Sequence, residues 1–384
     1  MISLAIPNLA GNERKYLNEC IDSTFVSTVG PFVSRFEQMV GEASGYSFNV
    51  ATSAGTTGLH AALIAVGVLP GDLVIIPGLS FIATANAVAH AHAQPWLLDI
   101  DCVSWTLDPR QLEKALLEET MTDQKGRLCH KSTGKRVAAV LPVYTLGMPA
   151  DMDPIVKLAR EFHLPVVADG AAALGALYKG RSSGDLGADL TMFSFNGNKT
   201  VTAGGGGAVC GNDETLVNRV RHLTTTARVG TDYDHDMVGF NYRMTNIQAA
   251  VGCAQMELLQ RFVARKREIS AFYDKRFSVL QCVSPFPQPE LAESACWFSG
   301  LVLADGDSLS LRTRLREKGI DARPFWKPLH LQIPFAGCPR EVLSVSENVW
   351  KRIVTLPCST GITDEELEYV ADIVISELEH EYGY

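Results

Sequence analysis

Two residues that could act together on a cofactor follow neighbouring apolar runs of the chain. Lys199 lies in SFNGNKTVTAGGGG, directly after the apolar run Leu190–Phe195 and shortly before the glycine run 204–207. Asp169 ends the apolar run Pro165–Ala168 and is followed by a glycine. A pyridoxal 5′-phosphate (PLP) enzyme needs a Schiff-base lysine and a carboxylate that keeps the pyridine nitrogen protonated. Together the two residues predict PLP chemistry.

Each residue alone also has an ordinary structural interpretation. Lys199 could be a solvated surface lysine, and Asp169 could be the N-cap of a helix. A Walker A phosphate loop is excluded, because Gly197-Asn198-Lys199 lacks the adjacent Gly-Lys pair of that motif. The pairing favours the functional interpretation, since a PLP site requires both residue types in one place.

A third segment predicts where the phosphate of such a cofactor would bind. Ser53–Gly58 (SAGTTG) opens the expected helix Gly58–Gly67. Hydroxyl residues and glycine at a helix N-terminus suit a phosphate, through free N–H groups and the positive end of the dipole. An ordinary helix cap is the alternative. Ser194 is close enough to Lys199 in sequence to reach the same phosphate. Phe81 is a candidate to lie on the cofactor ring, with a core position as its alternative.

Composition narrows the class of protein. Lys and Arg number 34 and Asp and Glu number 43, so the formal charge of −9 does not suit a nucleic-acid polyanion. The N-terminal stretch has no signal-peptide pattern. Apolar runs such as Val137–Val143 are far shorter than the ~18 residues of a membrane span. The nine irregularly spaced cysteines include no CxxC pair. We therefore expect a cytoplasmic protein with reduced thiols and no nucleic-acid or membrane partner.

No segment has metal-ligand spacing. The acidic stretch 232–236 (DYDHD) does not match a calcium loop, and a solvated acidic loop is the expected role. His330 in KPLHLQ stands alone, so a structural role is its default. We expect no metal site.

Apolar runs alternate with amphipathic stretches through the first two-thirds of the chain, and this predicts a mostly parallel sheet covered by helices on both faces. Ligands of such sheets bind at the carboxyl ends of the strands, where Asp169 and the segment after Phe195 lie.

Further predictions are a capped helix over Asp151–His163, a polar surface insertion over 118–136, a long helix from Thr245, a strand over Trp297–Leu303 and a C-terminal helix with a Thr363/Glu366 capping box. The predicted domains are a large one over 1–255 and a smaller C-terminal α+β one over 256–384.

The chain resembles the DegT-type (DegT/DnrJ/StrS) sugar aminotransferases, which have the aspartate-aminotransferase fold (PLP fold type I). The segments that carry the resemblance are FVSTVGPFVSRFE (25–37), TSAGTTGLHAAL (52–63), GVLPGDLVIIPGLSFIATANAV (67–88), LLDIDCVSWTLDP (97–109), GMPADMDPI (147–155), VVADGAAALGA (166–176), FSFNGNKTVTAGGGG (193–207), GFNYRMTNIQAA (239–250) and LPCSTGITDEEL (356–367).

The resemblance implies a homodimer with shared active sites and a role for each matching residue. Lys199 would hold PLP covalently, and Asp169 would pair with the pyridine nitrogen. Phe81 would stack on the ring. The implied phosphate contacts are Thr56, Thr57, Ser194 and, from the other subunit, Asn241. The residues implied near the nucleotide sugar are Ser27, Thr28, Gly30, Pro31, Tyr144, Arg243 and His330.

Two positions depart from the family pattern. The family often has Gln, His or Glu where this chain has Ala172, and it commonly has His where this chain has Tyr144. Relatives that eliminate water carry His in place of Lys199. The implied reaction is amino transfer from glutamate to a keto sugar, and its alternatives are another PLP reaction such as dehydration or a regulatory protein without turnover.

The substrate expected from the resemblance is a UDP-linked 4-keto-6-deoxy sugar. The FNGNK form, the glycine run and the 118–136 insertion resemble the branch that makes bacillosamine or legionaminic acid. Ser27–Pro31 offers small residues and backbone N–H groups for a diphosphate. Arg243, Arg323 and Lys327 are the cations nearest by motif, with surface ion pairs as the alternative role.

Overall fold

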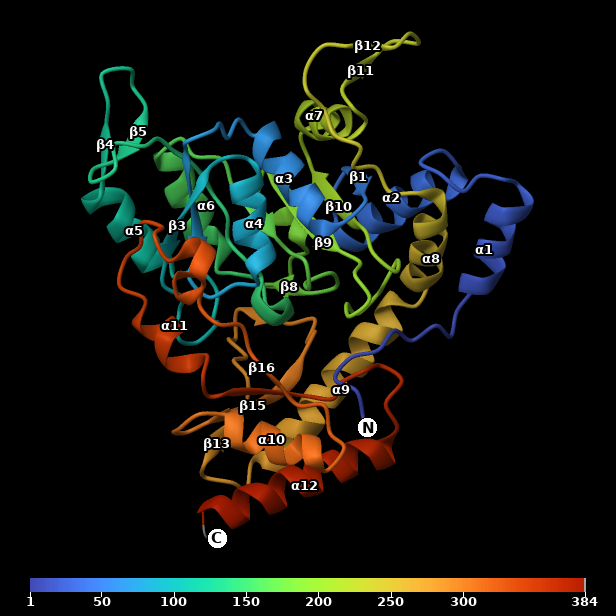
Figure 1. Cartoon of the computed structure of the whole chain (residues 1–384), viewed down its shortest axis with the longest axis vertical. Helices are drawn as coiled ribbons and strands as arrows, with labels where there is room; N and C mark the ends of the chain where they lie inside the picture. Colours follow the sequence, from blue (N-terminus) through green and yellow to red (C-terminus); the bar gives the residue numbers. More distant parts are fainter. Residues whose placement is uncertain (383–384) are drawn as a thin grey trace.

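The computed structural model describes residues 1–382 and has a large upper part and a smaller lower part (Figure 1). The upper part is built on strands in the orders β1-β10-β9-β7 and β3-β2-β6. Parallel bridges from Val140 to Val166 and from Val143 to Asp169 join the β6 and β7 ends of the two groups. The strands are β1 Phe48–Thr52, β2 Leu73–Pro77, β3 Gln94–Leu98, β6 Val137–Val140, β7 Val167–Asp169, β9 Leu190–Ser194 and β10 Gly207–Gly211.

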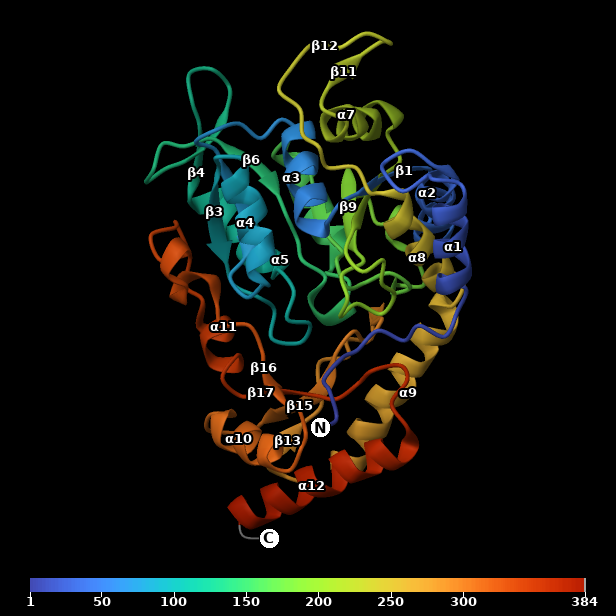
Figure 2. The same cartoon turned by 45° about the vertical axis from the view of Figure 1, so that its right-hand side comes forward.

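Helices cover both faces of this sheet because alternate strand residues point to opposite sides. Val50 and Val209 pack with Leu59 in one core cluster, whereas the adjacent Ala51 and Cys210 belong to a cluster on the other face. Figure 2 shows α3 and α4 in front of the strands. The first layer holds α3 Gly55–Ala65, α4 Ile82–His90 and α7 Glu214–Thr224, and the second holds α1 Glu13–Asp22, α2 Pro31–Ser44, α5 Pro109–Glu118, α6 Met152–Glu161 and α8 Asn246–Met256.

Three local predictions differ from the structure. Helix α3 begins at Gly55 instead of Gly58, because the Thr57 hydroxyl accepts the Ala54 N–H at 3.1 Å and closes the first turn earlier. Asp151 precedes α6 without capping it, since its carboxylate accepts the phenol of Tyr178 instead. The long helix predicted from Thr245 is two helices with a break at 257–258.

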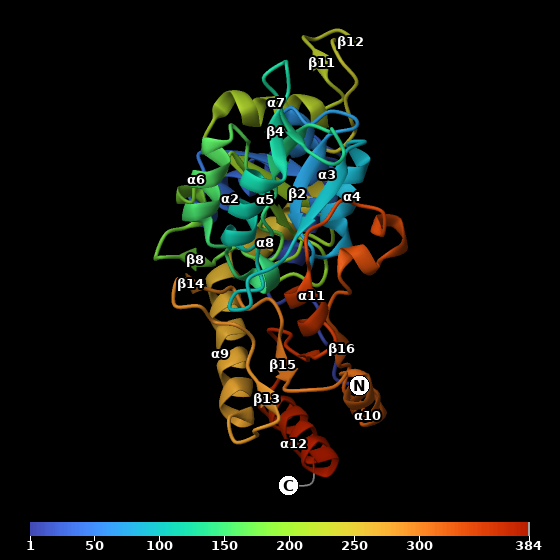
Figure 3. The same cartoon turned by 90° about the vertical axis from the view of Figure 1, so that its left-hand side faces the viewer.

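The polar insertion 118–136 forms a hairpin of β4 Thr120–Thr122 and β5 Leu128–His130. A second hairpin, β11 Arg228–Val229 with β12 Asp234–His235, projects from the top of the molecule in Figures 1 and 3. This hairpin contains the acidic stretch 232–236, and Tyr233 at its tip is exposed.

The lower part is built on α9 Leu259–Phe277 and a sheet of order β13-β15-β17-β16 (Figure 3). The first residues of the chain also lie against this part, because Ile2 forms a β-bridge with Ile320. The Thr363/Glu366 capping box is confirmed by two bonds of 3.1 Å. The division at 255/256 remains a prediction. The other elements are β13 Val283–Ser284, β15 Ser299–Leu303, α10 Leu309–Glu317, β16 Arg323–Pro324, α11 Ser344–Val349, β17 Ile353–Leu356, α12 Asp364–Tyr382, and β8 Leu177–Tyr178 paired with β14 Ala292–Glu293.

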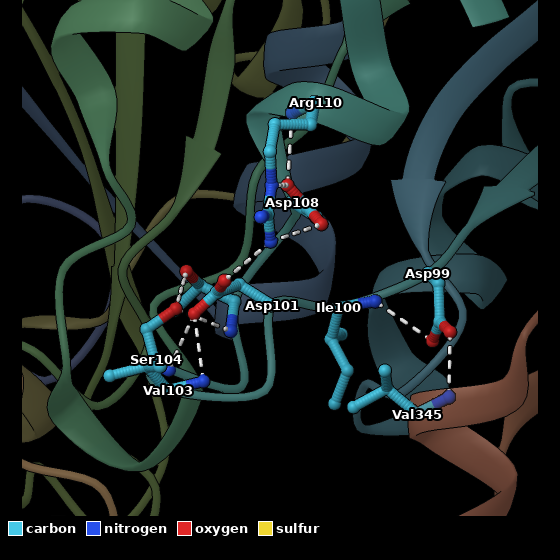
Figure 4. Close-up of polar contacts among 9 residues, drawn as sticks. Asp99, Ile100, Asp101, Val103, Ser104, Asp108, Arg110 and Val345 are labelled. Atoms are coloured by element: carbon cyan, nitrogen blue, oxygen red, sulfur yellow. Dashed lines mark hydrogen bonds and ion pairs between the residues drawn. The ribbon is translucent and has the colours of Figure 1, made fainter. Parts of the chain in front are cut away.

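A buried carboxylate fastens the lower part to the end of β3 (Figure 4). Asp99 accepts the backbone N–H groups of Val345 at 2.7 Å and Ser346 at 3.0 Å, and the Ser346 hydroxyl at 2.6 Å. Beyond it, Asp101 accepts the N–H groups of the following turn, while Arg110 pairs with Asp101 and Asp108. These contacts fix α11 at the sheet edge. Within residues 1–382 no helix is long and apolar enough to cross a bilayer.

Candidate active site

A cavity of about 360 Å³ opens at the carboxyl ends of the central strands. Its floor comes from residues after β6, β7 and β9 and from the first turns of α3 and α4, which is where a parallel sheet binds ligands. Trp297, Phe298 and Trp326 of the lower part form the opposite wall. Both predicted chemical residues, Lys199 and Asp169, line this cavity.

Asp169 ends β7 as a buried carboxylate, and no cation within residues 1–382 is hydrogen-bonded to it. Its Oδ2 accepts the Thr84 hydroxyl at 2.7 Å, and its Oδ1 accepts the Ala171 N–H at 3.1 Å. Burial raises the pKa of Asp169 above the usual value, although these two donors and the charge of Lys199 oppose the rise. A cationic group in the cavity would restore its charged form.

Lys199 reaches the cavity from the loop after β9. Its ammonium nitrogen lies 3.6 Å from the centroid of the Trp297 ring. The Trp297 indole N–H donates to the Asn198 carbonyl at 2.6 Å, so the ring and the lysine loop are fixed to each other. Burial lowers the pKa of Lys199 to about 8, and the Asp169 charge acts in the other direction. A lysine with this pKa is partly neutral near pH 8 and is therefore a competent nucleophile and base.

A cradle suited to an anion lies where α3 begins. Thr56 and Ser194 line the cavity, together with Gly55 and Gly206. A Cβ on Gly55 would lie 3.1 Å from the Ser194 Cβ, so a larger residue here would push against the strand β9. Gly206 has a φ of 109°, a conformation that favours glycine. The first N–H groups of a helix are free for an anion, and the helix dipole favours negative charge there.

Of four other predicted residues, Phe81 and Tyr144 line this cavity, and the other two do not. Phe81 lines it with an exposed ring, 5.8 Å from the Trp326 ring centroid. Tyr144 lines it as a buried residue beside Asp169. Thr57 turns its hydroxyl to Ser53 and Ala54, which makes it part of the helix cap. His330 is buried and bonds Glu347 at 2.8 Å.

The remaining predicted residues lie away from the cavity of their own chain. Arg243 bonds Glu37 at 2.7 Å and the Ala51 carbonyl at 3.0 Å, so its guanidinium is already engaged. Asn241 is exposed beside the β11–β12 hairpin, where it bridges Thr225. The segment Ser27–Pro31 is held by the buried side chain of Asn246, which donates to the Phe25 carbonyl and accepts the Phe32 N–H.

Sequence reasoning missed three residues of the site. Thr84 supports Asp169, and its position one helical turn after Phe81 places it on the same face of α4. Trp297 and Trp326 come from distant segments, and no local pattern marks them as site residues. The contact between Lys199 and Trp297 joins residues far apart in the sequence, so it can be recognised only once the fold is known.

A larger depression, about 820 Å³, lies elsewhere on the molecule. It contains Asp274, whose pKa burial raises to about 6, and Arg352. Arg352 is committed to Asn348 and to the Leu303 and Ala304 carbonyls, and Asp274 accepts the amide of Gln288. Volume alone therefore does not identify the site. The smaller cavity combines a lysine, a carboxylate and an anion cradle.

The residues present fit PLP. The cavity offers a carboxylate that lacks a cation, a lysine with a lowered pKa, a helix N-terminus for a phosphate and aromatic walls for a planar ring. The buried phenol oxygen of Tyr144 has no hydrogen-bond partner within residues 1–382, as expected of a group that awaits a bound molecule.

Comparison with known proteins gives one result over the whole length. The model of the DegT/DnrJ/EryC1/StrS aminotransferase family matches residues 7–375. The GDP-perosamine synthases of Caulobacter vibrioides and Escherichia coli O157:H7 are 36% and 34% identical, each over 96% of this chain and 96% of the relative. The aminotransferase TlmJ of Streptoalloteichus hindustanus superposes with a TM-score of 0.89 at 27% identity over 100% of both chains. The expected fold type I is confirmed.

Proposed function

Because the chain belongs to the DegT/DnrJ/EryC1/StrS aminotransferase family and is a PLP-dependent sugar aminotransferase, we propose that it aminates a nucleotide-linked 4-keto-6-deoxy sugar. The observation that carries the site assignment is the presence of Asp169 and Lys199 in one cavity with the α3 N-terminus. Glutamate is the proposed amino donor.

Six residues of the cavity have a defined role in this proposal. PLP, when bound, supplies a ring that takes up the electrons of the C–H bond being broken. Lys199 holds the cofactor and then moves a proton at its Nζ, for which a pKa of about 8 is suited. Asp169 keeps the ring nitrogen charged. Thr56 and Ser194 bind the phosphate, while Trp297 and Trp326 exclude water from the lysine.

The nucleotide is the least fixed part of the proposal. The FNGNK form and the 118–136 insertion favour a UDP sugar, whereas the similarity to the two GDP-perosamine synthases favours a GDP sugar. Sequence motifs support the one nucleotide and relatives over nearly the whole chain support the other, so the proposal includes both. The diphosphate would meet the Ser27–Pro31 segment, whereas the exposed Asn241 of a second subunit would reach the phosphate of the cofactor.

A panel of keto sugars tests this proposal. The protein, PLP and glutamate are incubated with GDP-, UDP- and dTDP-linked 4-keto-6-deoxy sugars, and 2-oxoglutarate release is measured. Release with one nucleotide series identifies the substrate. Glutamate alone releases one equivalent of 2-oxoglutarate per site as it converts the cofactor, so the readout is release beyond that equivalent. If no series gives it while glutamate still converts the cofactor spectrum, the nucleotide-sugar assignment is contradicted and amino transfer is left intact.

A mixing experiment tests the proposed homodimer. Lys199→Ala removes the lysine of a site, and Asn241→Ala removes the proposed contact from the other subunit. Mixed dimers contain one site with both residues intact, so activity should return to about a quarter of the wild-type value at equal mixing, because half of the dimers are mixed and each has one good site. No recovery, or a fully active monomer, would contradict a shared site.

The alternative chemistry is dehydration on the same scaffold. Lys199 opposes it, since the water-eliminating relatives carry His at this position. Conversion of the cofactor spectrum by glutamate in a single half-reaction distinguishes the two, because only a transaminase keeps the amino group on the cofactor.

A further inference from the structure

Tyr144 carries a buried hydroxyl that the folded chain leaves without a partner. The residue is 1% exposed, and its phenol oxygen has no hydrogen-bond partner in residues 1–382. Burial of an unpaired hydroxyl costs about 1–3 kcal/mol, so native proteins rarely retain one without a use. Tyr144 also lines the cavity that contains Asp169 and Lys199.

The strand order fixes which side of the cavity Tyr144 occupies. The anion cradle lies at the ends of β1, β10 and β9, and Asp169 ends β7, the next strand. Val143 bridges Asp169, and the Tyr144 N–H donates to the Asp169 carbonyl at 2.9 Å. Tyr144 therefore stands beyond Asp169, on the side opposite the cradle.

The covalent structure of PLP then decides what Tyr144 would meet. The ring nitrogen and the carbon that bears the aldehyde lie on one axis of the ring. The phosphate arm is attached on one side of this axis, and the ring hydroxyl is attached on the other side. With the nitrogen at Asp169 and the arm in the cradle, the ring hydroxyl faces the end of β6.

We propose that the Tyr144 phenol donates a hydrogen bond to the ring hydroxyl oxygen of bound PLP, an inference that rests on the roles proposed above for Asp169 and the cradle. The other polar groups that line this side of the cavity already have hydrogen-bond partners. Thr84 donates to Asp169, Ser80 bonds Thr84 at 2.8 Å, and Ala172 has no polar side-chain atom. Burial raises the pKa of Tyr144 well above 10, which keeps its donor proton in place.

Tyr144→Phe tests the hydrogen bond with measurements that do not depend on turnover. The cofactor-free variant should unfold at the same temperature as the wild type or higher, because the lost hydroxyl had no partner. Its dissociation constant for PLP should rise by about tenfold to a hundredfold, as expected for a hydrogen bond to a charged oxygen.

The absorption spectrum of the bound cofactor gives a second signature. A donor at the ring oxygen competes with the protonated lysine–cofactor nitrogen for the charge on that oxygen, so loss of the donor should raise the pH midpoint of the spectral change by about one unit. Asp169 and Lys199 are the other ionisable groups that line the cavity among the described residues, and the variant leaves both in place. Tyr273→Phe is the matched control, since its phenol bonds the Pro357 carbonyl at 2.8 Å far from the cavity.

The outcomes separate this inference from the proposed function. If the wild type binds PLP with no spectral change at all, the proposed function fails. If the wild type behaves as expected but Tyr144→Phe leaves the PLP dissociation constant and the pH midpoint unchanged, the inference alone is wrong. A rise in KM for the keto sugar without a spectral shift would assign the phenol to the sugar instead.

Discussion

The cavity differs from a set of buried polar residues that hold the lower part together and fasten it to β3, here called the seam (Asp99, Lys266 and Tyr273). The same residue types have hydrogen-bond partners in the seam that they lack in the cavity. Lys199 in the cavity places its ammonium over an indole ring. Lys266 in α9 is also buried, but it donates to the Trp297 carbonyl at 2.8 Å and the Cys358 carbonyl at 2.6 Å. The seam satisfies its lysine with hydrogen bonds, and the cavity does not.

The contrast extends to the acids and the phenols. Asp99 in the seam accepts bonds from Ile100, Val345 and Ser346, whereas Asp169 accepts two and has a raised pKa. Tyr273 bonds a carbonyl, while Tyr144 bonds nothing within residues 1–382. The three residues of the seam are satisfied by the fold and hold the structure together, whereas their counterparts in the cavity are available to a ligand.

The strongest test of this contrast is one substitution made at both lysines. Lys199→Met should abolish covalent attachment of PLP and reduce turnover by about 10³-fold or more, because both the anchor and the proton carrier are lost. Lys266→Met should retain the attachment. Borohydride reduction followed by peptide mapping reads out the attachment in each variant. A pyridoxyl label on Lys266, or on any lysine other than Lys199, would end the assignment.

The next largest effect comes from making the same substitution at one aspartate of each region. Asp169→Asn should lower turnover by about 10²- to 10⁴-fold, since loss of one partner from a buried charge pair costs roughly 3–5 kcal/mol. The variant should still bind PLP covalently. Asp99→Asn should instead reduce the thermal stability and leave turnover per folded molecule close to the wild-type value. Near-normal turnover of Asp169→Asn would contradict its role at the ring nitrogen.

The sequence was sufficient for the features that local patterns encode. Apolar strands ending in Asp169 and preceding Lys199 could be recognised because parallel strands collect ligands at one edge. The sheet, the Thr363 cap and the cradle at α3 followed from similar local rules. The start of α3 was missed because a threonine inside the helix, Thr57, supplies the cap.

The rest of the site depends on tertiary contacts that no local pattern contains. Trp297 is far from Lys199 in sequence, and β15 brings it to the cavity only after the lower part has folded. The engagement of Arg243 by Glu37 is equally non-local. The absence of a partner for Tyr144 depends on every neighbour at once, so only a structure can reveal it.

Stability provides a third test, in which the two lysines should give effects of opposite sign. In the cofactor-free protein the pKa of Lys199 is lowered from 10.5 to about 8, so the folded state binds fewer protons than the unfolded state between these values. The free energy that folding loses by burying the Lys199 ammonium is therefore largest below pH 8, and it disappears as the pH rises towards 10.5. Lys199→Met should therefore stabilise the cofactor-free protein by up to about 3 kcal/mol at pH 7. Lys266→Met should destabilise it by about 3 kcal/mol, because two buried carbonyls lose their donor.

Denaturant unfolding at several pH values measures both effects. The gain from Lys199→Met should shrink steadily above pH 8, whereas Lys266→Met should lose stability at pH 7. Equal losses in both variants would mean that the cavity lysine is as well satisfied as the seam lysine, and the contrast between the two regions would fail.

The smallest expected effect concerns the ring on which Lys199 rests. The electron-rich face of Trp297 stabilises the ammonium and so opposes the effect of burial on its pKa. Trp297→Leu should lower the pKa of Lys199 below 8 by about one unit or less, and Trp297→Phe should lower it by a smaller amount, since a phenyl face attracts a cation more weakly than indole. The pH dependence of the rate at which the cofactor-free protein captures PLP reports this pKa. Trp350→Leu is the control, because it removes an indole that does not line the cavity and should leave the profile unchanged. A shift to higher pH in Trp297→Leu would show that water entering the enlarged cavity outweighs the lost ring, and Trp297 would then act by excluding solvent instead of by holding the cation.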